Sequence, residues 1–293
     1  MELSSKLPAS ALQREGAIKV ALRSVGPWCA AAVVLLGGCG WGPAYFLGKS
    51  DREIKASTQA IETARNDAQR AQAHAARARA YSEKARYSRA SKLISPEEYG
   101  RLFDLAVKDH DQAAALAPGD AQVYLMRGLT FYDRAALEDR ADPRTKALFD
   151  AAKADFTSAI DRDRRNEQAF NMRGLVHVAN GDLDQAISDF AEVMTINPRL
   201  GKIRLAEAYC ERGSSYVRDK RYDLAISDFE NAIAQCAPSD GCDCQPDSPL
   251  AWTYYETRQF DKSWATVHRA QRATRWISPE FIAELKKASE RDK

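Results

Sequence analysis

Apolar residues recur with a helical period between residues 106 and 270. A small residue, a large side chain four positions later and a small residue three positions after that share one face of an α-helix. The spacing is clear in three segments and weaker in two others: Ala152, Phe156 and Ala159; Ala186, Phe190 and Val193; Ala225, Phe229 and Ala232; then Ala106, His110 and Ala113; and Ser263, Val267 and Ala270. Each segment is predicted to be an amphipathic helix that buries this stripe.

A second pattern precedes the three clear segments. An aromatic residue is followed by an Arg-Gly pair, and another ring stands three positions after the glycine: Tyr124, Arg127-Gly128 and Phe131; Phe170, Arg173-Gly174 and His177; Tyr209, Arg212-Gly213 and Tyr216. The missing side chain of the glycine lets a neighbouring helix come close. Residues 186–190 and 225–229 are both Ala-Ile-Ser-Asp-Phe and lie 39 positions apart. The two patterns together therefore predict a repeated unit of two antiparallel helices.

A different pattern occupies residues 26–48, which are mostly apolar and carry no charge. At ~1.5 Å per residue this stretch is long enough to cross a ~30 Å hydrocarbon core. Trp28 near one end, with Trp41 and Tyr45 toward the other, suits rings at the two membrane interfaces. We predict a transmembrane helix over 26–48 after a basic N-terminal tail, residues 1–25. A buried core helix is the alternative.

The same stretch offers a second export interpretation. Leu36-Gly37-Gly38-Cys39 resembles a bacterial lipobox, in which Cys39 would be acylated. Residues 41–47 remain apolar after it, which favours an uncleaved signal anchor. Lys and Arg within about fifteen residues of the span number three on each side, so these charges do not decide the orientation. Both export interpretations place the later residues outside the cytoplasm. The favoured signal anchor predicts a single-pass inner-membrane protein with a periplasmic repeat domain.

Residues 51–92 contain no proline or glycine and are rich in helix-forming residues. They predict one long helical stalk, assigned to residues 49–80 as a segment of its own. Alanines at steps of four and three draw a narrow stripe along it: Ala56, Ala60, Ala64, Ala68, Ala71, Ala75 and Ala78. The stalk is interpreted either as a solvated spacer or as a coiled-coil seam for self-association.

The formal net charge of the chain is only +2, which does not indicate a nucleic-acid partner. Residues 49–92 nevertheless carry eleven Lys or Arg against five Asp or Glu, while residues 93–293 sum to about −6. The chain is therefore basic beside the predicted span and acidic beyond it.

The order aromatic, glycine, aromatic, alanine, aromatic, alanine, proline resembles the tetratricopeptide repeat (TPR) family, whose units are helix-turn-helix pairs of 34 residues. The resemblance covers roughly residues 81–278. Two departures are the extra residues around Asp142-Pro143 and the added turn at residues 199–203. Ser278-Pro279 predicts the start of a C-terminal capping helix, residues 279–293, which a solenoid needs at its end.

The resemblance implies that a partner peptide or helix binds in a groove lined by the first helices of the units. The corresponding partner-binding positions in this chain are Leu125, Met126, Leu129 and Tyr132 in one unit and Asn171, Met172, Leu175 and Val178 in the next. The alternative is that these side chains are covered by the chain itself. The lysine and asparagine set with which some TPR domains hold a C-terminal carboxylate is missing at these positions.

The sequence predicts no catalytic residue, cofactor or metal site. Its four histidines are scattered, and it contains neither a phosphate-binding glycine loop nor a nucleophile elbow. Cys236, Cys242 and Cys244 crowd one loop. Three sulfurs are too few for an ordinary zinc site, whereas a disulfide would suit an oxidising compartment. Cys236 is expected to pair with Cys242, Cys244 or Cys210, because a direct bridge within Cys242-Asp-Cys244 would be strained.

These observations predict an all-α, TPR-like helix-turn-helix solenoid, residues 81–278, preceded by a transmembrane helix and an alanine-rich helical stalk. The predicted function is a membrane-tethered, non-enzymatic protein–protein interaction scaffold that binds a partner peptide or helix in the groove. The alternative is a periplasmic TPR lipoprotein adaptor, acylated at Cys39, that recruits an envelope enzyme.

Overall fold

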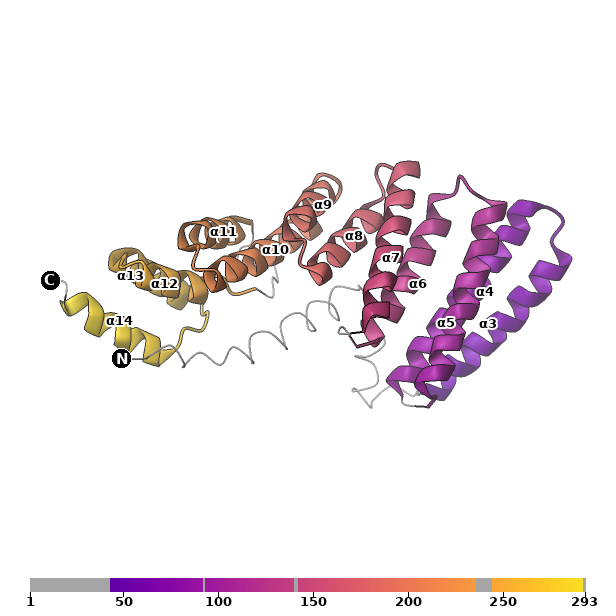
Figure 1. Ribbon diagram of the computed structural model, residues 1–293, viewed down its shortest axis with the longest axis horizontal. Helices are drawn as coiled ribbons and strands as arrows, with labels where there is room; N and C mark the ends of the chain where they lie inside the picture. The colour runs from indigo at the N-terminus through magenta and orange to yellow at the C-terminus, as the bar shows by residue number, and fades with distance from the viewer. Residues whose placement is uncertain (1–42, 92, 140–141, 236–243, 292–293) are drawn as a thin grey trace. The chain divides into compact units, whose positions relative to one another are not determined.

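The computed structural model describes residues 43–91, 93–139, 142–235 and 244–291. Every secondary-structure element in these ranges is an α-helix (Figure 1). The chain divides into two compact units, which are described separately: unit 1 ends at Asn180 and unit 2 begins at Gly181.

Unit 1 contains six helices among its described residues, and α3 to α7 lie side by side (Figure 1): α3 (Pro43–Thr63), α4 (Asp67–Ala90), α5 (Pro96–Leu116), α6 (Ala121–Leu137), α7 (Pro143–Arg162) and α8 (Glu167–Asn180). Unit 2 contains six more: α9 (Leu183–Ile196), α10 (Pro198–Arg218), α11 (Tyr222–Gln235), α12 (Asp247–Glu256), α13 (Phe260–Arg272) and α14 (Pro279–Arg291). Within the units, the hairpins α4–α5, α6–α7, α10–α11 and α12–α13 pack as antiparallel pairs. We call α4, α6, α8, α10 and α12 first helices, and α5, α7, α9, α11 and α13 second helices.

Local sequence sets several of the helix boundaries. Ser95-Pro96, Asp142-Pro143 and Asn197-Pro198 each place a polar cap before a proline at the first helical position. The cap side chain accepts a hydrogen bond from a backbone N–H of the first turn, which would otherwise lack a partner inside the helix. Proline costs nothing there because its missing N–H is not needed. The dipeptide Asn197-Pro198 therefore both ends α9 and starts α10.

The predicted small-large-small stripes form the core. Phe156, Phe190 and Phe229 are at most 1% exposed, and the small residues of their stripes are fully buried. A Cβ built on Gly128 would lie 2.7 Å from Cε1 of Phe156, and one on Gly213 would lie 2.9 Å from Cε1 of Phe229. The glycine is thus required because the ring of the second helix rests against the backbone of the first.

One part of the predicted fold class is wrong. Within the described ranges, no helix is long and apolar enough to cross a membrane. Most of the predicted span, residues 26–42, lies outside those ranges. Its last residues open α3, which continues through Lys49, Asp51 and Arg52, and such charges are expensive in a hydrocarbon core. The predicted signal anchor and the single-pass inner-membrane localisation with a periplasmic repeat domain are corrected with it.

The predicted single-helix stalk is also wrong. The chain breaks between α3 and α4, where the Asn66 side chain accepts a hydrogen bond from the backbone N–H of Gln69 at 2.9 Å. The two helices fold back on each other: Phe46 stacks on Tyr87 with ring centroids 4.6 Å apart, and Lys84 pairs with Asp51 at 2.8 Å. Good helix propensity along the whole segment concealed this break, because one capping residue is enough to start a new helix.

The alanines of the supposed stalk also pack differently from the prediction. The buried ones lie in α4 and are Ala71, Ala73, Ala78, Ala80 and Ala85. Ala56, Ala60 and Ala68 are exposed, although the predicted stripe included them. The small residues of α4 are therefore used inside unit 1, where α4 packs against both α3 and α5.

The two predicted departures from regular repeats lengthen helices. The extra residues near Asp142 make α6 17 and α7 20 residues long, against 14 for α8 and for α9. The extra turn at residues 199–203 belongs to α10, which has 21 residues. Added length at a helix end leaves the packing of the core stripe in place.

Candidate partner-binding face

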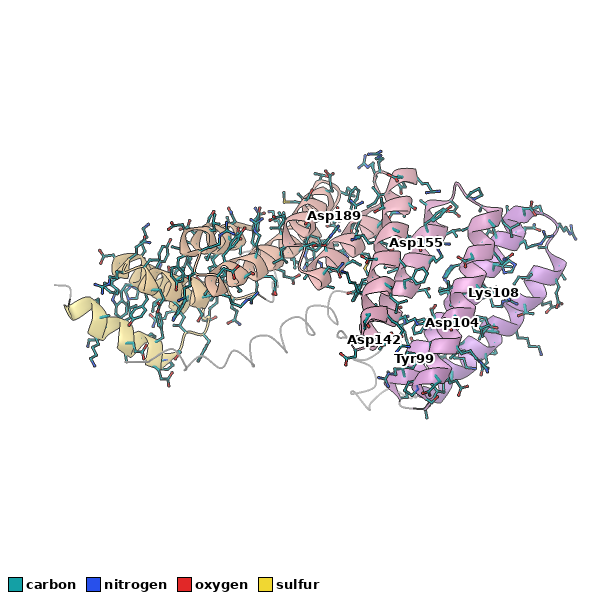
Figure 2. The ribbon with its side chains drawn as sticks, in the orientation of Figure 1. Tyr99, Asp104, Lys108, Asp142, Asp155 and Asp189 are labelled. Atoms are coloured by element: carbon teal, nitrogen blue, oxygen red, sulfur yellow. The ribbon has the colours of Figure 1, made fainter. Side chains whose placement is uncertain are left out.

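In three hairpins, an arginine of the first helix holds a buried aspartate of the second helix. Arg127 in α6 donates from Nε and Nη2 to the two carboxylate oxygens of Asp155 in α7, at 2.8 and 2.7 Å. Figure 2 labels Asp155 on its helix. Arg212 binds Asp228 with the same geometry, at 2.8 and 2.7 Å. Such forked pairs fix both distance and orientation, so they set the register of the two helices.

A third pair shows where the repeats begin. Arg77 in α4 donates to both oxygens of Asp109 in α5, each at 2.7 Å. The hairpin α4–α5 is therefore built like the later ones, with Ala78 in the place of the glycine and His110 in the place of the ring. Sequence reasoning recognised His110 but not Arg77. Arg77 and Asp109 are 32 positions apart, against 28 for Arg127 and Asp155 and 16 for Arg212 and Asp228. The distance is longest here because more of α4 and α5 lies between the pair and the turn.

The electrostatics of these pairs differ in detail. Hydrogen bonding to Asp155 raises the pKa of Arg127, and hydrogen bonding to Asp228 raises that of Arg212. Burial alone would raise the pKa of Asp109, but the hydrogen bonds from Arg77 and His74 lower it below its ordinary value. His74 contributes through a contact of 2.8 Å between Nδ1 and Oδ1. The ion pair between arginine and aspartate therefore holds the two helices of each hairpin together.

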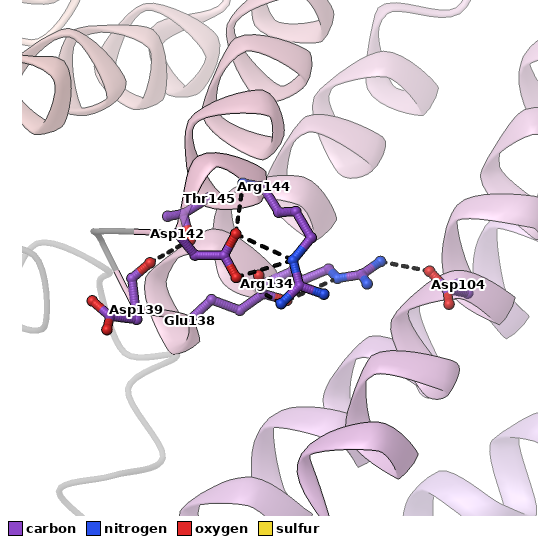
Figure 3. A network of polar contacts seen from close by, with 7 residues as sticks. All are labelled: Asp104, Arg134, Glu138, Asp139, Asp142, Arg144 and Thr145. Atoms are coloured by element: carbon purple, nitrogen blue, oxygen red, sulfur yellow. Dashed lines mark hydrogen bonds and ion pairs between the residues drawn. The ribbon is translucent and has the colours of Figure 1, made fainter.

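The same arginines reach the element that precedes each hairpin. Nη1 of Arg127 lies 2.7 Å from Asp111 of α5, and Nη1 of Arg77 lies 3.2 Å from the Thr58 hydroxyl of α3. About two turns further along α6, Arg134 binds both Asp104 of α5 and Glu138 (Figure 3). These contacts stack successive helix pairs.

Stacking brings the first helices α4, α6 and α8 into contact with one another. The Ser82 and Thr130 hydroxyls lie 3.1 Å apart between α4 and α6, and Arg86 pairs with Asp133 at 3.3 Å. Burial raises the pKa of Asp133 despite the charge of Arg86. We call the surface that α4, α6 and α8 form together the A-helix face.

The structure divides the eight predicted groove residues into two groups. Five are at most 7% exposed: Leu125, Tyr132, Asn171, Met172 and Leu175. The others, Met126, Leu129 and Val178, are half-buried. The role of all eight in binding stays a prediction, but only the half-buried group offers surface that a partner can contact without moving the core.

Sequence reasoning missed the exposed part of this face. Gln72, Gln122 and Gln168 each stand six positions before the glycine or its alanine substitute, so they share one register on α4, α6 and α8. All three are exposed. In α6, Leu125 follows Gln122 by three positions and Leu129 follows Leu125 by four. Gln122 therefore lies on the same side of the helix as both leucines. The row was readable once the repeats had been aligned on their Arg-Gly pairs.

The described residues include two of the four cysteines predicted as disulfide candidates. Cys210 of α10 and Cys244, just before α12, are free thiols that pack in one cluster with Ala206 and Ala232. Cys236 and Cys242 lie outside the described residues, so their predicted pairing stays a prediction. Across the described ranges, no group of three or more His, Cys, Asp or Glu side chains is arranged to hold a metal ion.

The arrangement of helices within each unit is that of a helical-repeat protein. Residues 167–200 and 206–236 match the family model of the tetratricopeptide repeat. The chain therefore contains tetratricopeptide repeats, which confirms the resemblance drawn from its sequence. Repeats of this class generally build extended binding surfaces rather than catalytic sites.

Several solved structures are similar to this chain at low sequence identity. YrrB, described as a TPR protein with an unusual peptide-binding site, is 19% identical; the match covers 75% of this chain and 93% of YrrB, with a TM-score of 0.44. MamA is 19% identical over 64% and 89% of the two chains, with a TM-score of 0.43. BtubC from P. vanneervenii is 16% identical over 80% and 91%, with a TM-score of 0.45. These scores assign neither a partner nor an activity to this chain. No curated protein sequence matches it.

Proposed function

We propose that this chain is a protein–protein interaction scaffold without catalytic activity, and that the A-helix face of unit 1 binds an extended segment of a partner protein. The observation that carries this proposal is the exposed row Gln72, Gln122 and Gln168 beside the half-buried Met126, Leu129 and Val178. One face thus combines polar groups at one edge with adaptable apolar side chains along its middle.

Side-chain amides suit the main chain of an extended segment. Each carboxamide offers one oxygen acceptor and two N–H donors, and an extended segment presents unpaired backbone N–H and C=O groups. Packed helices lie ~8–10 Å apart, while an extended chain advances ~3.3 Å per residue. An extended partner therefore advances from one glutamine of the row to the next with about every third residue.

The apolar side chains supply the second part of the interaction. Methionine is unbranched and polarisable, so Met126 can fit partner side chains of several shapes. Leu129 follows it by nearly one turn in α6, and Val178 lies on the neighbouring α8. An extended partner that lays its backbone on the glutamine row directs part of its side chains toward these residues.

Selection from a library of displayed random linear peptides tests this proposal, with binding of the enriched peptides then measured by fluorescence anisotropy. Changing Gln72, Gln122 and Gln168 together to alanine is expected to weaken binding at least tenfold, since each net hydrogen bond contributes about 1 kcal/mol. The matched control changes three exposed glutamines on other helices to alanine, Gln59, Gln112 and Gln271, and is expected to bind as the wild type does.

Two results would contradict the proposal: no linear peptide is enriched, or enriched peptides bind the glutamine-row variant as tightly as the control. Leu125, Met172 and Leu175 are unsuitable positions for charged test substitutions. Because they are buried, a glutamate there would place an unpaired charge in the core and unfold the unit. Met126→Lys is the better apolar probe, since its side chain is half-buried.

A further inference from the structure

Two cysteines that are far apart in sequence meet in unit 2. Cys210 lies in the middle of α10, and Cys244 lies at the segment that enters α12. Both are half-buried free thiols and pack in one small cluster with Ala206, Tyr209 and Ala232. The two thiols are within hydrogen-bonding reach of one another.

We propose that Cys210 and Cys244 are a dithiol site that takes up oxidising equivalents from a disulfide and closes as a reversible Cys210–Cys244 bond. This inference is independent of the partner-binding proposal for unit 1. It requires that the Cys210 and Cys244 side chains, which pack in one cluster, bring their sulfur atoms to the bonded separation of ~2.05 Å.

The reaction balances as two successive thiol–disulfide exchanges. The Cys244 thiol loses its proton, and its sulfur attacks one sulfur of a disulfide RSSR; this S–S bond breaks and releases RS⁻, which takes up a proton. The Cys210 thiol then loses its proton and attacks the Cys244 sulfur of the mixed disulfide, which expels the second RS⁻. The protein loses two electrons and two protons, and one RSSR becomes two RSH.

The environment decides the order of the two thiols. Hydrogen bonding to Cys244 and burial raise the pKa of the Cys210 thiol well above its ordinary value, so little of it is ionised at neutral pH. The thiolate is the attacking species. Cys210 therefore acts second, once the mixed disulfide has brought an electrophilic sulfur directly beside it.

The bond would fasten α12 to α10 across the long connection after α11. Asp247, three residues beyond Cys244, is 1% exposed and pairs with Arg269 of α13 and with Arg275. A covalent bond at Cys244 therefore also restrains the last helix pair through these ion pairs. Cys210 also stands three positions before Gly213, the register that Leu125 and Asn171 occupy in unit 1, so oxidation alters the corresponding side of α10.

Trypsin alone cannot identify the bond, because residues 222–258 form one peptide that contains Cys236, Cys242 and Cys244. The test therefore uses the full chain with Cys236→Ser and Cys242→Ser, incubated with oxidised glutathione, quenched in acid and digested. The expected product joins residues 205–212 to residues 222–258, which in this variant is a Cys210–Cys244 bond. Its urea midpoint should rise on oxidation, while addition of Cys210→Ser should abolish both the product and the rise.

A stable glutathione adduct on Cys244 with Cys210 still free would overturn the proposal, as would unreacted thiols at both positions after wild-type folding has been verified by circular dichroism. The wild-type chain is the second readout. If its oxidised form joins Cys210 to Cys236 or Cys242 instead, shown by partial reduction and stepwise alkylation, the assigned pair is wrong.

Discussion

Arg212 joins Asp228 and Asp184 with a single guanidinium group. Its Nη2 lies 2.7 Å from Asp228 of α11, and its Nη1 lies 2.6 Å from Asp184 of α9. The Asp228 side chain is 4% exposed and the Asp184 side chain 76% exposed. The two contacts therefore differ in consequence, because only the buried carboxylate would lose its partner without gaining water.

Arg212→Ala is expected to lower the free energy of unfolding of the chain by about 3–5 kcal/mol, since it leaves Asp228 buried and unpaired. Asp184→Ala should have little effect, because an exposed pair contributes about 0–1 kcal/mol. Urea denaturation followed by circular dichroism measures both. Arg218→Ala, at an exposed arginine of the same helix, is the control. Equal effects of Arg212→Ala and Arg218→Ala would show that the forked pair does not stabilise the hairpin.

Gly128→Ala is expected to destabilise unit 1, because the new Cβ would lie 2.7 Å from the Phe156 ring. Overpacking of this kind typically costs about 1–3 kcal/mol. Gly119→Ala is the control, since a Cβ there meets nothing within 4 Å. A combined Gly128→Ala and Phe156→Leu variant should lose less than the sum of the single changes. Additive losses would mean that the glycine and the ring do not share their space.

His110 predicts a pH dependence of stability. Burial, and next the charge of Arg127, lower its pKa from 6.5 to about 4, while Asp109 acts in the opposite direction. The unfolded chain therefore binds this proton more readily than the folded chain. Stability from this group is complete above pH 6.5 and falls as the pH drops toward 4, by about 3 kcal/mol at ~1.4 kcal/mol per unit.

The variant with Ala78→Gly and His110→Phe gives this hairpin the glycine and ring of the later ones, and it should lose that part of the slope. Thermal unfolding between pH 4 and pH 7 gives the comparison. The His74→Gln chain controls for the histidine that contacts Asp109. If the wild type and the His110 variant have the same pH profile, His110 is not held neutral in the fold.

Lys220→Gly is expected to stabilise unit 2. Lys220 has a φ of 57° after α10, a conformation that costs a non-glycine residue roughly 1–2 kcal/mol. The next N–H, of Arg221, bonds to the Tyr216 carbonyl at 2.8 Å, as in the usual helix ending with glycine at this position. Lys202→Gly, inside α10, should destabilise by about 1 kcal/mol instead. Melting temperatures that move in the same direction for both variants would refute this prediction.

The repeats could be predicted from sequence because their information is local. Ala225, Phe229 and Ala232 follow the period of one helix. Arg212-Gly213 stands as far before Ala225 as Arg173-Gly174 stands before Ala186. A helix period and a helix cap depend on residues within one or two turns. The family model confirms the resemblance to tetratricopeptide repeats. The rings of the three clear stripes, Phe156, Phe190 and Phe229, are buried as the pattern predicted.

Tertiary structure decided what the local patterns left ambiguous. Alanine-rich residues 51–92 predicted one helix, whereas the structure divides them between α3 and α4. Only the packing of α4 against both α3 and α5 shows which alanines are buried. Leu125 and Met126 are adjacent apolar residues in one helix, yet one is buried and the other is half-buried. That difference arises from the neighbouring helices, because solvent exposure is a property of the packed assembly and not of the residue type.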